Sequence, residues 1–224
     1  MTRTLVITGG HGVLGRAVLV AAMAEGLNVA VIDHARGEAV PDGVLELGGV
    51  DLTDGAAAER AMSAVVERFG RIDGLLNIAG GFVWQTVDDA EPAWDRMFAL
   101  NVTTALNATR AALPHLKKSD DGRIVNVGAN GALKSAAGMG AYAASKSGVH
   151  RLTESLAEEL KSTSVTVNAV LPSILDTEQN RRDMPDADPA KWVRPADLAR
   201  VMLFLASPDS RAMTGALIPV TGRV

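Results

Sequence analysis

The hydrophobic positions of this chain fall into two kinds of segment that alternate along it. Short runs of four to seven residues rich in Val, Ile and Leu are typical of buried strands, and longer stretches with apolar residues every third or fourth position are typical of helices. The predicted strands are Thr4 to Thr8, Asn28 to Asp33, Val44 to Leu47, Ile72 to Ile78, Arg123 to Val127, Val165 to Val170 and Ala216 to Val220. The predicted helices are Leu14 to Glu25, Asp54 to Phe69, Glu91 to Leu116, Met139 to Leu160 and Pro195 to Leu205.

This order of strands and helices predicts the fold class. Strands joined by helical connections pair in parallel, and right-handed connections place helices on both faces of the sheet. We therefore predict a Rossmann-like α/β fold with a doubly wound parallel sheet, formed by a single domain over residues 1–224. Pro114 lies inside the third predicted helix and is expected to kink it or end it early.

Composition and charge argue against several classes of function. The net charge of −4 and the lack of Lys/Arg clusters mixed with aromatic residues speak against a nucleic-acid partner. The longest apolar run, Ala17 to Ala24, is too short to cross a membrane, so we expect a soluble, cytoplasmic protein. The chain has no Cys and its four His residues lack metal-ligand spacing, so no metal site is predicted.

A glycine-rich segment, Thr8-Gly9-Gly10-His11-Gly12-Val13-Leu14-Gly15, lies between the first predicted strand and the first predicted helix. Glycines in this context let the backbone approach a pyrophosphate, whose charge the free N–H groups at the helix start can bind. The segment therefore predicts a dinucleotide site. An ordinary glycine-rich turn between a strand and a helix is the alternative.

Asp33, at the end of the second predicted strand, bears on which dinucleotide binds. A carboxylate eighteen residues after Gly15 can accept hydrogen bonds from the adenosine ribose and repel a 2′-phosphate, which favours NAD over NADP. His34 and Arg36 lie beside it in the sequence and would soften this preference. A solvated strand end or a helix cap is the alternative interpretation of Asp33.

Tyr142 and Lys146 are four residues apart in the fourth predicted helix, and Tyr142 is the only tyrosine of the chain. Residues with this spacing share one helical face, so the ammonium group can lie beside the phenol. A neighbouring positive charge lowers the pKa of a phenol and would let Tyr142 exchange a proton near neutral pH. The spacing alone is common in helices, but together with the glycine-rich segment it indicates a catalytic pair.

These motifs together resemble the short-chain dehydrogenase/reductase family over nearly the whole chain. The family pattern T-G-x-x-x-G-x-G matches Thr8, Gly9 and Gly15, whereas Val13 replaces the middle glycine and Gly12 stands one position earlier. Further matches, in chain order, are Asp51-Leu52, Asn77-Ile78-Ala79-Gly80, Asn101, Tyr142 with Lys146, and Pro172-Ser173-Ile174-Leu175-Asp176-Thr177.

Each of these further matches also has an ordinary structural explanation. Asn77 and Asn101 would serve equally as helix caps, and Pro172 as the end of a strand. Their combination in the family's order is what favours the resemblance. The cofactor-binding residues that it implies are Thr8, Gly9, Gly12, Val13, Leu14, Gly15, Asp33, Asp51, Leu52, Asn77, Ala79, Gly80, Tyr142, Lys146, Pro172, Ile174 and Thr177.

The resemblance implies an NAD(P)-dependent oxidoreductase that transfers a hydride between nicotinamide and a small carbonyl, alcohol or conjugated C=N substrate. Tyr142 would donate the proton, Lys146 would lower the pKa of Tyr142 and bind the nicotinamide ribose, and Asn101 would hold a water in the proton path. The family also implies a homodimer or homotetramer. The alternative is a catalytically idle, nucleotide-sensing protein, against which the intact catalytic residues argue.

One position departs from the family pattern. The family usually has a serine thirteen residues before the tyrosine, where it holds the substrate oxygen, and this position is Ala129 here, which has no side-chain donor. Asn130, Ser135 or a water are candidate replacements. Ala129, the shifted glycine and the segments around Tyr142 and after Leu171 resemble the dihydropteridine reductases within the family, which also lack the serine.

Residues 173–194 are polar, without a sustained period, and are expected to form a loop that covers the substrate. Met184 and Trp192 are candidates for the roof of the substrate pocket, which would also include Ala129, Asn130 and Ser135. Arg181 and Arg182 either meet an anionic substrate or face solvent, and an ordinary surface loop is the alternative for the whole segment.

Overall fold

All seven strands form one parallel sheet in the computed structural model, which describes residues 2–36, 40–89, 91 and 93–224. The strand order is β3-β2-β1-β4-β5-β6-β7, so the chain builds the sheet outward from β1 in one direction and then from β4 in the other. This confirms the predicted doubly wound parallel sheet. The strands are β1 (Thr4–Thr8), β2 (Asn28–Asp33), β3 (Leu45–Gly48), β4 (Gly74–Asn77), β5 (Arg123–Val127), β6 (Thr166–Pro172) and β7 (Leu217–Val220).

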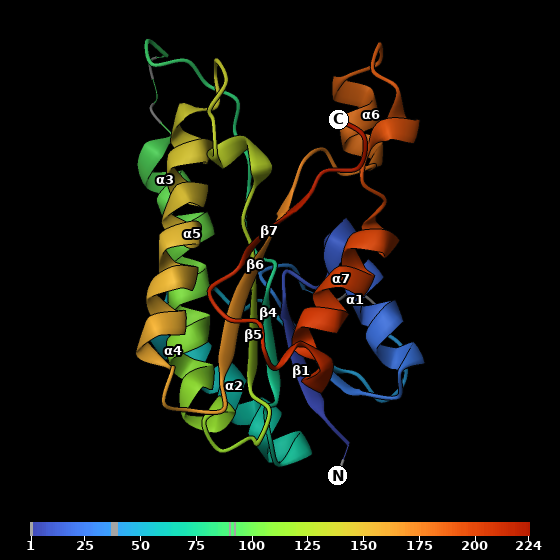
Figure 1. Cartoon of the computed structure of the whole chain (residues 1–224), viewed down its shortest axis with the longest axis vertical. Helices are drawn as coiled ribbons and strands as arrows, with labels where there is room; N and C mark the ends of the chain where they lie inside the picture. Colours follow the sequence, from blue (N-terminus) through green and yellow to red (C-terminus); the bar gives the residue numbers. More distant parts are fainter. Residues whose placement is uncertain (1, 37–39, 90, 92) are drawn as a thin grey trace.

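Helices cover both faces of the sheet (Figure 1). One hydrophobic cluster joins the sheet to α2, α4 and α5, and a second joins the opposite face to α1 and α7. The long helices are α1 (Val13–Ala24), α2 (Gly55–Phe69), α4 (Thr104–Leu116), α5 (Gly140–Glu159) and α7 (Pro195–Ala206). The shorter elements are α3 (Trp94–Phe98), the π-helical turn η1 (Ala99–Thr103), α6 (Glu178–Asp183) and the 3₁₀ turns η2 (Asn130–Ala132), η3 (Pro189–Lys191) and η4 (Pro208–Ser210).

The third predicted helix differs from its prediction in three ways. It begins at Trp94 rather than Glu91, and the π-helical turn η1 interrupts it at Ala99–Thr103. Pro114 does not end it, because α4 continues to Leu116 and the proline removes only one backbone donor in the last turn. A π-helical turn leaves no regular signature in the hydrophobic period, so the sequence pattern could not reveal it.

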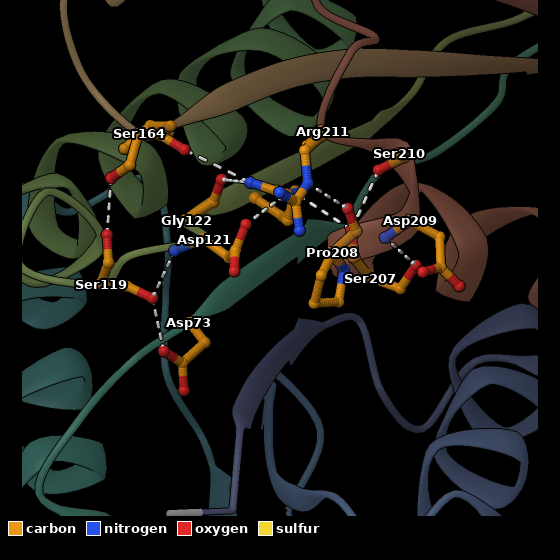
Figure 2. A network of polar contacts seen from close by, with 12 residues as sticks. Asp73, Ser119, Asp121, Gly122, Ser164, Ser207, Pro208, Asp209, Ser210 and Arg211 are labelled. Atoms are coloured by element: carbon orange, nitrogen blue, oxygen red, sulfur yellow. Dashed lines mark hydrogen bonds and ion pairs between the residues drawn. The ribbon is translucent and has the colours of Figure 1, made fainter.

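Buried polar groups connect the amino-terminal ends of the central strands. The Asp73 carboxylate is fully buried and accepts hydrogen bonds from Arg71 at 2.6 and 2.8 Å, from the Ser119 hydroxyl at 2.6 Å and from the Thr4 amide at 2.9 Å. Figure 2 shows the contact between Asp73 and Ser119 and its continuation to the loops around it. These bonds join the starts of β1 and β4, so they stabilise the amino-terminal ends of the strands, opposite to their carboxyl ends.

Arg123 extends the same network to the start of β5. Its side chain is 1% exposed and pairs with Asp121 at 2.8 Å, while it donates to the Ser207 carbonyl at 2.9 Å. Burying a guanidinium group is costly unless its N–H groups find acceptors, and here backbone carbonyls from separate loops supply them. The network is therefore structural and is remote from the carboxyl ends of the strands.

Candidate active site

A cavity of about 660 Å³ opens at the carboxyl ends of the strands, where the strand order reverses between β1 and β4. This is the position at which open α/β sheets bind ligands. Ten of the residues implied by the sequence line it: Gly9, Gly12, Val13, Leu14, Gly15, Asp33, Asp51, Leu52, Ala79 and Gly80.

The glycine-rich segment forms a tight turn between β1 and α1. Gly9 has φ of +67°, and a Cβ on Gly15 would lie 2.3 Å from the Gly9 carbonyl oxygen, so neither position accepts a side chain without movement. Helix α1 begins at Val13 after Gly12, with no side-chain cap and no acidic residue in its first turn. Its first N–H groups are thus not capped by a side chain, and the positive end of the helix faces the cavity.

Thr8 and Asn77 do not line the cavity but support its floor. The Thr8 hydroxyl accepts hydrogen bonds from the Ile78 and Ala79 amides at 3.0 and 3.1 Å, which fixes the chain after β4. The Asn77 amide donates to Thr109 and to Asn126, and its buried oxygen has no partner among the residues that the structure describes. Asn77 is therefore the buried last residue of β4, and the alternative that it caps a helix is wrong.

Asp33 is fixed by backbone amides at the cavity wall. Its two carboxylate oxygens accept hydrogen bonds from the amides of His11 and Ala35, both at 2.9 Å. His34 also lines the cavity, whereas the Arg36 side chain packs beside Gly49, where an added Cβ would lie 2.2 Å from its Nε. Of the two residues expected to soften the preference for NAD, His34 lies at the cavity and Arg36 does not line it.

Asp51 and Leu52 lie on the same wall as Asp33. The Asp51 carboxylate accepts hydrogen bonds from the side chain and the amide of Thr53 at 2.7 and 2.9 Å, and these bonds hold the pKa of Asp51 below its ordinary value. The carboxylate is consequently charged at neutral pH and is already turned toward its own loop. Leu52 is 5% exposed and contributes apolar surface.

Tyr142 and Lys146 lie one turn apart on α5, as predicted. The Lys146 ammonium donates to the Val127 carbonyl at 2.7 Å, and burial lowers its pKa to about 8. The phenol of Tyr142 is met edge-on by the Phe82 ring, with centroids 4.9 Å apart and an angle of 84° between the rings. Burial raises the pKa of Tyr142 to about 12, which is opposite in direction to the lowering expected from the neighbouring Lys146.

Asn101 lies in the π-helical turn η1, and the alternative that it caps a helix is therefore wrong. Its side chain accepts from the Gly81 amide at 3.0 Å, donates to the Gly81 carbonyl at 3.1 Å and donates to the Ser145 hydroxyl at 3.0 Å. A Cβ on Gly80 would lie 2.5 Å from the Asn101 oxygen and 3.5 Å from the Lys146 nitrogen. Because Gly80 lines the cavity, Asn101 and Lys146 lie next to the edge of the cavity.

The segment after β6 contains more regular structure than expected. Thr177 caps α6 by accepting a hydrogen bond from the Asn180 amide, and Leu175 pairs with Val193 in an isolated bridge. Residues 173–194 were predicted to form a substrate-covering loop, and the short helix α6 lies within it, because six residues are too few to show a helical period. Arg181 pairs with Asp176 at 2.6 Å and is exposed, and Arg182 is also exposed.

The remaining predicted residues have different surroundings. Pro172 ends β6 opposite Val220, and the Ile174 carbonyl accepts a hydrogen bond from Val193. None of the predicted substrate-pocket residues lines the cavity: Ala129 is 3% exposed, Asn130 begins η2, Ser135 is exposed and donates to the Ala136 carbonyl, Met184 is half-buried, and Trp192 is 5% exposed.

Several residues at the site escaped prediction from the sequence. Val127 and Leu175 line the cavity, and Phe82 contacts Tyr142. Val127 ends a predicted strand, so its position at the carboxyl edge was a usable signal. Phe82 gave none, because an aromatic residue in an irregular segment does not indicate which side chain it meets.

No helix among the described residues is long and apolar enough to cross a membrane. Within the same residues, no group of three or more His, Asp or Glu is placed to hold a metal ion.

Known proteins resemble this chain over nearly its full length. The short chain dehydrogenase family matches residues 3–188. The 2-(S)-hydroxypropyl-CoM dehydrogenase 3 of Xanthobacter autotrophicus is 32% identical, with 97% of this chain and 94% of the relative covered. A 3-oxoacyl-(acyl-carrier-protein) reductase of Mycobacterium bovis is also 32% identical, with 99% of this chain and 92% of the relative covered.

A solved structure agrees with these relatives. The 3-ketoacyl-(acyl-carrier-protein) reductase from Brucella melitensis, complexed with NADH, superposes with a TM-score of 0.87 at 26% identity, covering 99% of this chain and 98% of that one. The match extends over the glycine-rich segment, the sheet and the helix that carries Tyr142 and Lys146. The chain therefore belongs to the short-chain dehydrogenase/reductase family and is an NAD(P)-dependent oxidoreductase.

Proposed function

We propose that this oxidoreductase prefers NAD to NADP, and the observation that carries the proposal is the placement of Asp33. Its carboxylate lies on the cavity wall and is fixed by two backbone amides. Each oxygen keeps a further lone pair with which it can accept a hydrogen bond from a ribose hydroxyl. A fixed negative charge at this point also repels a 2′-phosphate, and the Arg36 side chain packs against Gly49 instead of lining the cavity.

The residues present fit a dinucleotide. The uncapped start of α1 offers N–H groups to a pyrophosphate, and Gly12 has no side chain between them and the cavity. Val127, Leu100 and Leu175 give the opposite end of the cavity an apolar lining that suits a ring system. A bound nicotinamide would supply or accept the hydride, and all other functions fall to side chains of the chain itself.

We assign proton transfer to Tyr142 and positioning to Lys146 and Asn101. A phenol whose pKa is about 12 keeps its proton at neutral pH, so Tyr142 enters a reduction in the protonated form that a general acid requires, but as a weak acid. Lys146, with a pKa of about 8, is mostly charged at neutral pH and can bind ribose hydroxyls beside the Val127 carbonyl. Asn101 holds the Gly81 backbone and Ser145 in place, and Ser145 donates to the Tyr142 carbonyl at 2.8 Å.

The substrate class that we propose is a small carbonyl compound or its alcohol. The names of both relatives above refer to a hydroxyl-bearing or an oxo-bearing substrate. A second candidate is a flat conjugated substrate with a C=N bond, such as a pterin. Two features favour it: Ala129 offers no side-chain donor for a ketone oxygen, and the Phe82 ring stands beside Tyr142.

Cofactor preference is tested by thermal unfolding. A ligand that binds only the native state raises its stability, so NADH should raise Tm more than NADPH at equal concentration. Asp33→Ser should reduce the difference, and Asp209→Asn, which removes an exposed carboxylate in η4, should leave it unchanged. Equal shifts for both dinucleotides in the wild-type protein would contradict the assignment of Asp33, and a larger shift with NADPH would point to His34 or Arg36.

Substrate class is tested by NADH absorbance with carbonyl compounds, alcohols and pterins in parallel. Ala129→Ser restores a hydroxyl, and one well-placed donor can increase the rate by about 10²–10³. For a pocket built around a ketone, this variant should gain ketone reduction. For a pocket built around a flat ring, it should lower the native activity and gain nothing with ketones, so the two candidates give opposite results.

A further inference from the structure

Helix α5 carries a second buried polar side chain on the face that bears Tyr142 and Lys146. His150 follows Lys146 by one helical turn and is 2% exposed. The proton and hydride chemistry described above does not use its imidazole. A buried titratable ring beside the catalytic pair therefore needs its own explanation.

The imidazole of His150 binds the backbone at Ala129, a residue that the sequence predicts to be in the substrate pocket. Its Nε2 lies 3.3 Å from the amide nitrogen of Ala129, within hydrogen-bond geometry. A backbone N–H can only donate, so Nε2 must be unprotonated and the proton of the neutral ring must be on Nδ1. The ring also lies against Gly128, where an added Cβ would come within 2.5 Å of Nε2.

Lys146 and His150 hold two consecutive peptide groups. Lys146 donates to the carbonyl of the Val127–Gly128 peptide at 2.7 Å, and His150 accepts from the N–H of the Gly128–Ala129 peptide. Val127 lines the cofactor cavity, and Ala129 stands where the family usually has its serine. One face of α5 thus fixes the chain where it passes from the cofactor cavity to the substrate side.

The surroundings of His150 favour the neutral ring. Burial lowers the pKa of His150, and the charges of Arg151 and Lys146 lower it further. Both cations belong to α5, and Arg151 is paired on the surface with Glu154 at 2.9 Å. Gly128, Ala129 and Leu171, which meet at the ring or at the Gly128 position, carry no ionisable side chain.

We propose that His150 is a positioning residue of the reaction, a role that rests on the function proposed above. Its neutral imidazole fixes the Gly128–Ala129 peptide and so keeps the pocket wall and the carbonyl that receives Lys146 in one arrangement. Protonation would remove the acceptor, leave the Ala129 N–H without a partner and place a second cation near Lys146. Activity should therefore fall on the acid side as His150 takes up a proton.

Two variants test this role. In His150→Gln an amide oxygen can replace Nε2 as acceptor, whereas His150→Leu fills a similar volume without an acceptor. We expect His150→Leu to lower kcat/KM by about tenfold, the order expected when a buried N–H loses its partner. His150→Gln should stay within about threefold of the wild type and lose the acid limb of the pH profile, because Gln does not titrate.

His115→Gln is the matched control, because His115 is a half-buried histidine at the end of α4 whose pKa is also lowered by burial. It should keep both the rate and the pH profile. Wild-type rate together with an unchanged acid limb in His150→Leu would overturn the proposal. If His150→Leu does not fold, His150→Gln decides, and an acid limb that persists in it overturns the proposal equally.

A readout without substrate separates this proposal from the proposed function. Nitrogen-15 NMR of the wild-type protein at pH 7 should show His150 as the neutral ring with its proton on Nδ1, and a charged ring or the opposite tautomer would overturn the proposal. The amide of Ala129 should exchange faster in His150→Leu than in the wild type. Lack of turnover with every substrate would contradict the proposed function alone, and the NMR and exchange results would then decide the role of His150.

Discussion

An added methyl group should mainly lower stability at one glycine of the turn, Gly15, and mainly weaken NADH binding at another, Gly12. On Gly15 a Cβ would lie 2.3 Å from the Gly9 oxygen and 2.6 Å from the Gly10 Cα, and both neighbours are backbone atoms that cannot rotate away. On Gly12 the same atom would meet only the Gly9 oxygen, at 3.3 Å. Gly12 also lines the cavity and has φ of −70° and ψ of 164°, which alanine adopts freely.

The expected magnitudes follow from these contacts. In Gly15→Ala the overlap costs up to about 3 kcal/mol and the better helix propensity of alanine returns about 1 kcal/mol, so the protein should lose about 2 kcal/mol of stability. For a chain of 224 residues this lowers Tm by about 4–8 °C. In Gly12→Ala the loss should be only about 0.5 kcal/mol, because the change is confined to a helix N-cap without a side-chain bond.

The affinity for NADH should also distinguish Gly12→Ala. If Gly12 is there to let a pyrophosphate approach the start of α1, its replacement by alanine should weaken NADH binding by about tenfold to a hundredfold, equivalent to about 1.4–2.8 kcal/mol. Scanning fluorimetry gives Tm, and NADH fluorescence titration gives Kd. A Gly12→Ala protein that binds NADH as the wild type does would refute the assignment of the shifted glycine. An unchanged Tm in Gly15→Ala would refute the packing argument.

Three further predictions concern other parts of the molecule. Tyr142→Phe should lower kcat by about 10²-fold and leave the Kd of NADH unchanged, and near-normal turnover in a steady-state assay would remove Tyr142 from the mechanism. Burial raises the pKa of Asp73, but the hydrogen bonds from Arg71, Ser119 and Thr4 outweigh burial and hold that pKa below its ordinary value. The stability that the Asp73 carboxylate contributes is therefore present above pH 3.8 and is lost as the pH falls further. Asp73→Asn should flatten the acid limb of a plot of unfolding free energy against pH. Small apolar residues on more than one face of α4 and α5, together with the family resemblance, predict a dimer or tetramer, and a monomer in light scattering at micromolar concentration would contradict it.

The fold was predictable because its signals are local and repeated. Each strand is a short apolar run, and each long helix has a regular apolar period, so the alternation alone implies the doubly wound sheet. The errors lie where the local signal is weak. The strand predicted over Ile72 to Ile78 is confined to Gly74–Asn77, and after Asn77 the amides of Ile78 and Ala79 donate to the Thr8 hydroxyl, a tertiary contact that the sequence does not display.

The cofactor half of the site was more predictable than the substrate half for a related reason. Gly9, Gly15 and Asp33 act through backbone shape and the end of a strand, both of which are readable from sequence order. The substrate side depends on which side chains meet across distant segments, as Phe82 and Tyr142 do. Trp192, predicted to roof the pocket, does not line the cavity described above; it is 5% exposed, and its backbone lies next to Gly222, contacts that a sequence pattern does not give.

The two ionisable groups of the catalytic pair show why spacing alone does not give chemistry. Four-residue spacing places Lys146 near Tyr142, but the ammonium group is directed to the Val127 carbonyl, which takes up one of its donors. Burial then acts on both groups toward their neutral forms, raising the pKa of the phenol to about 12 and lowering that of the amine to about 8. At neutral pH the phenol therefore keeps its proton and the amine is mostly charged, but a pKa of about 12 makes the phenol a weaker acid than a free tyrosine. The direction of both shifts comes from burial, which the four-residue spacing of the two side chains does not display.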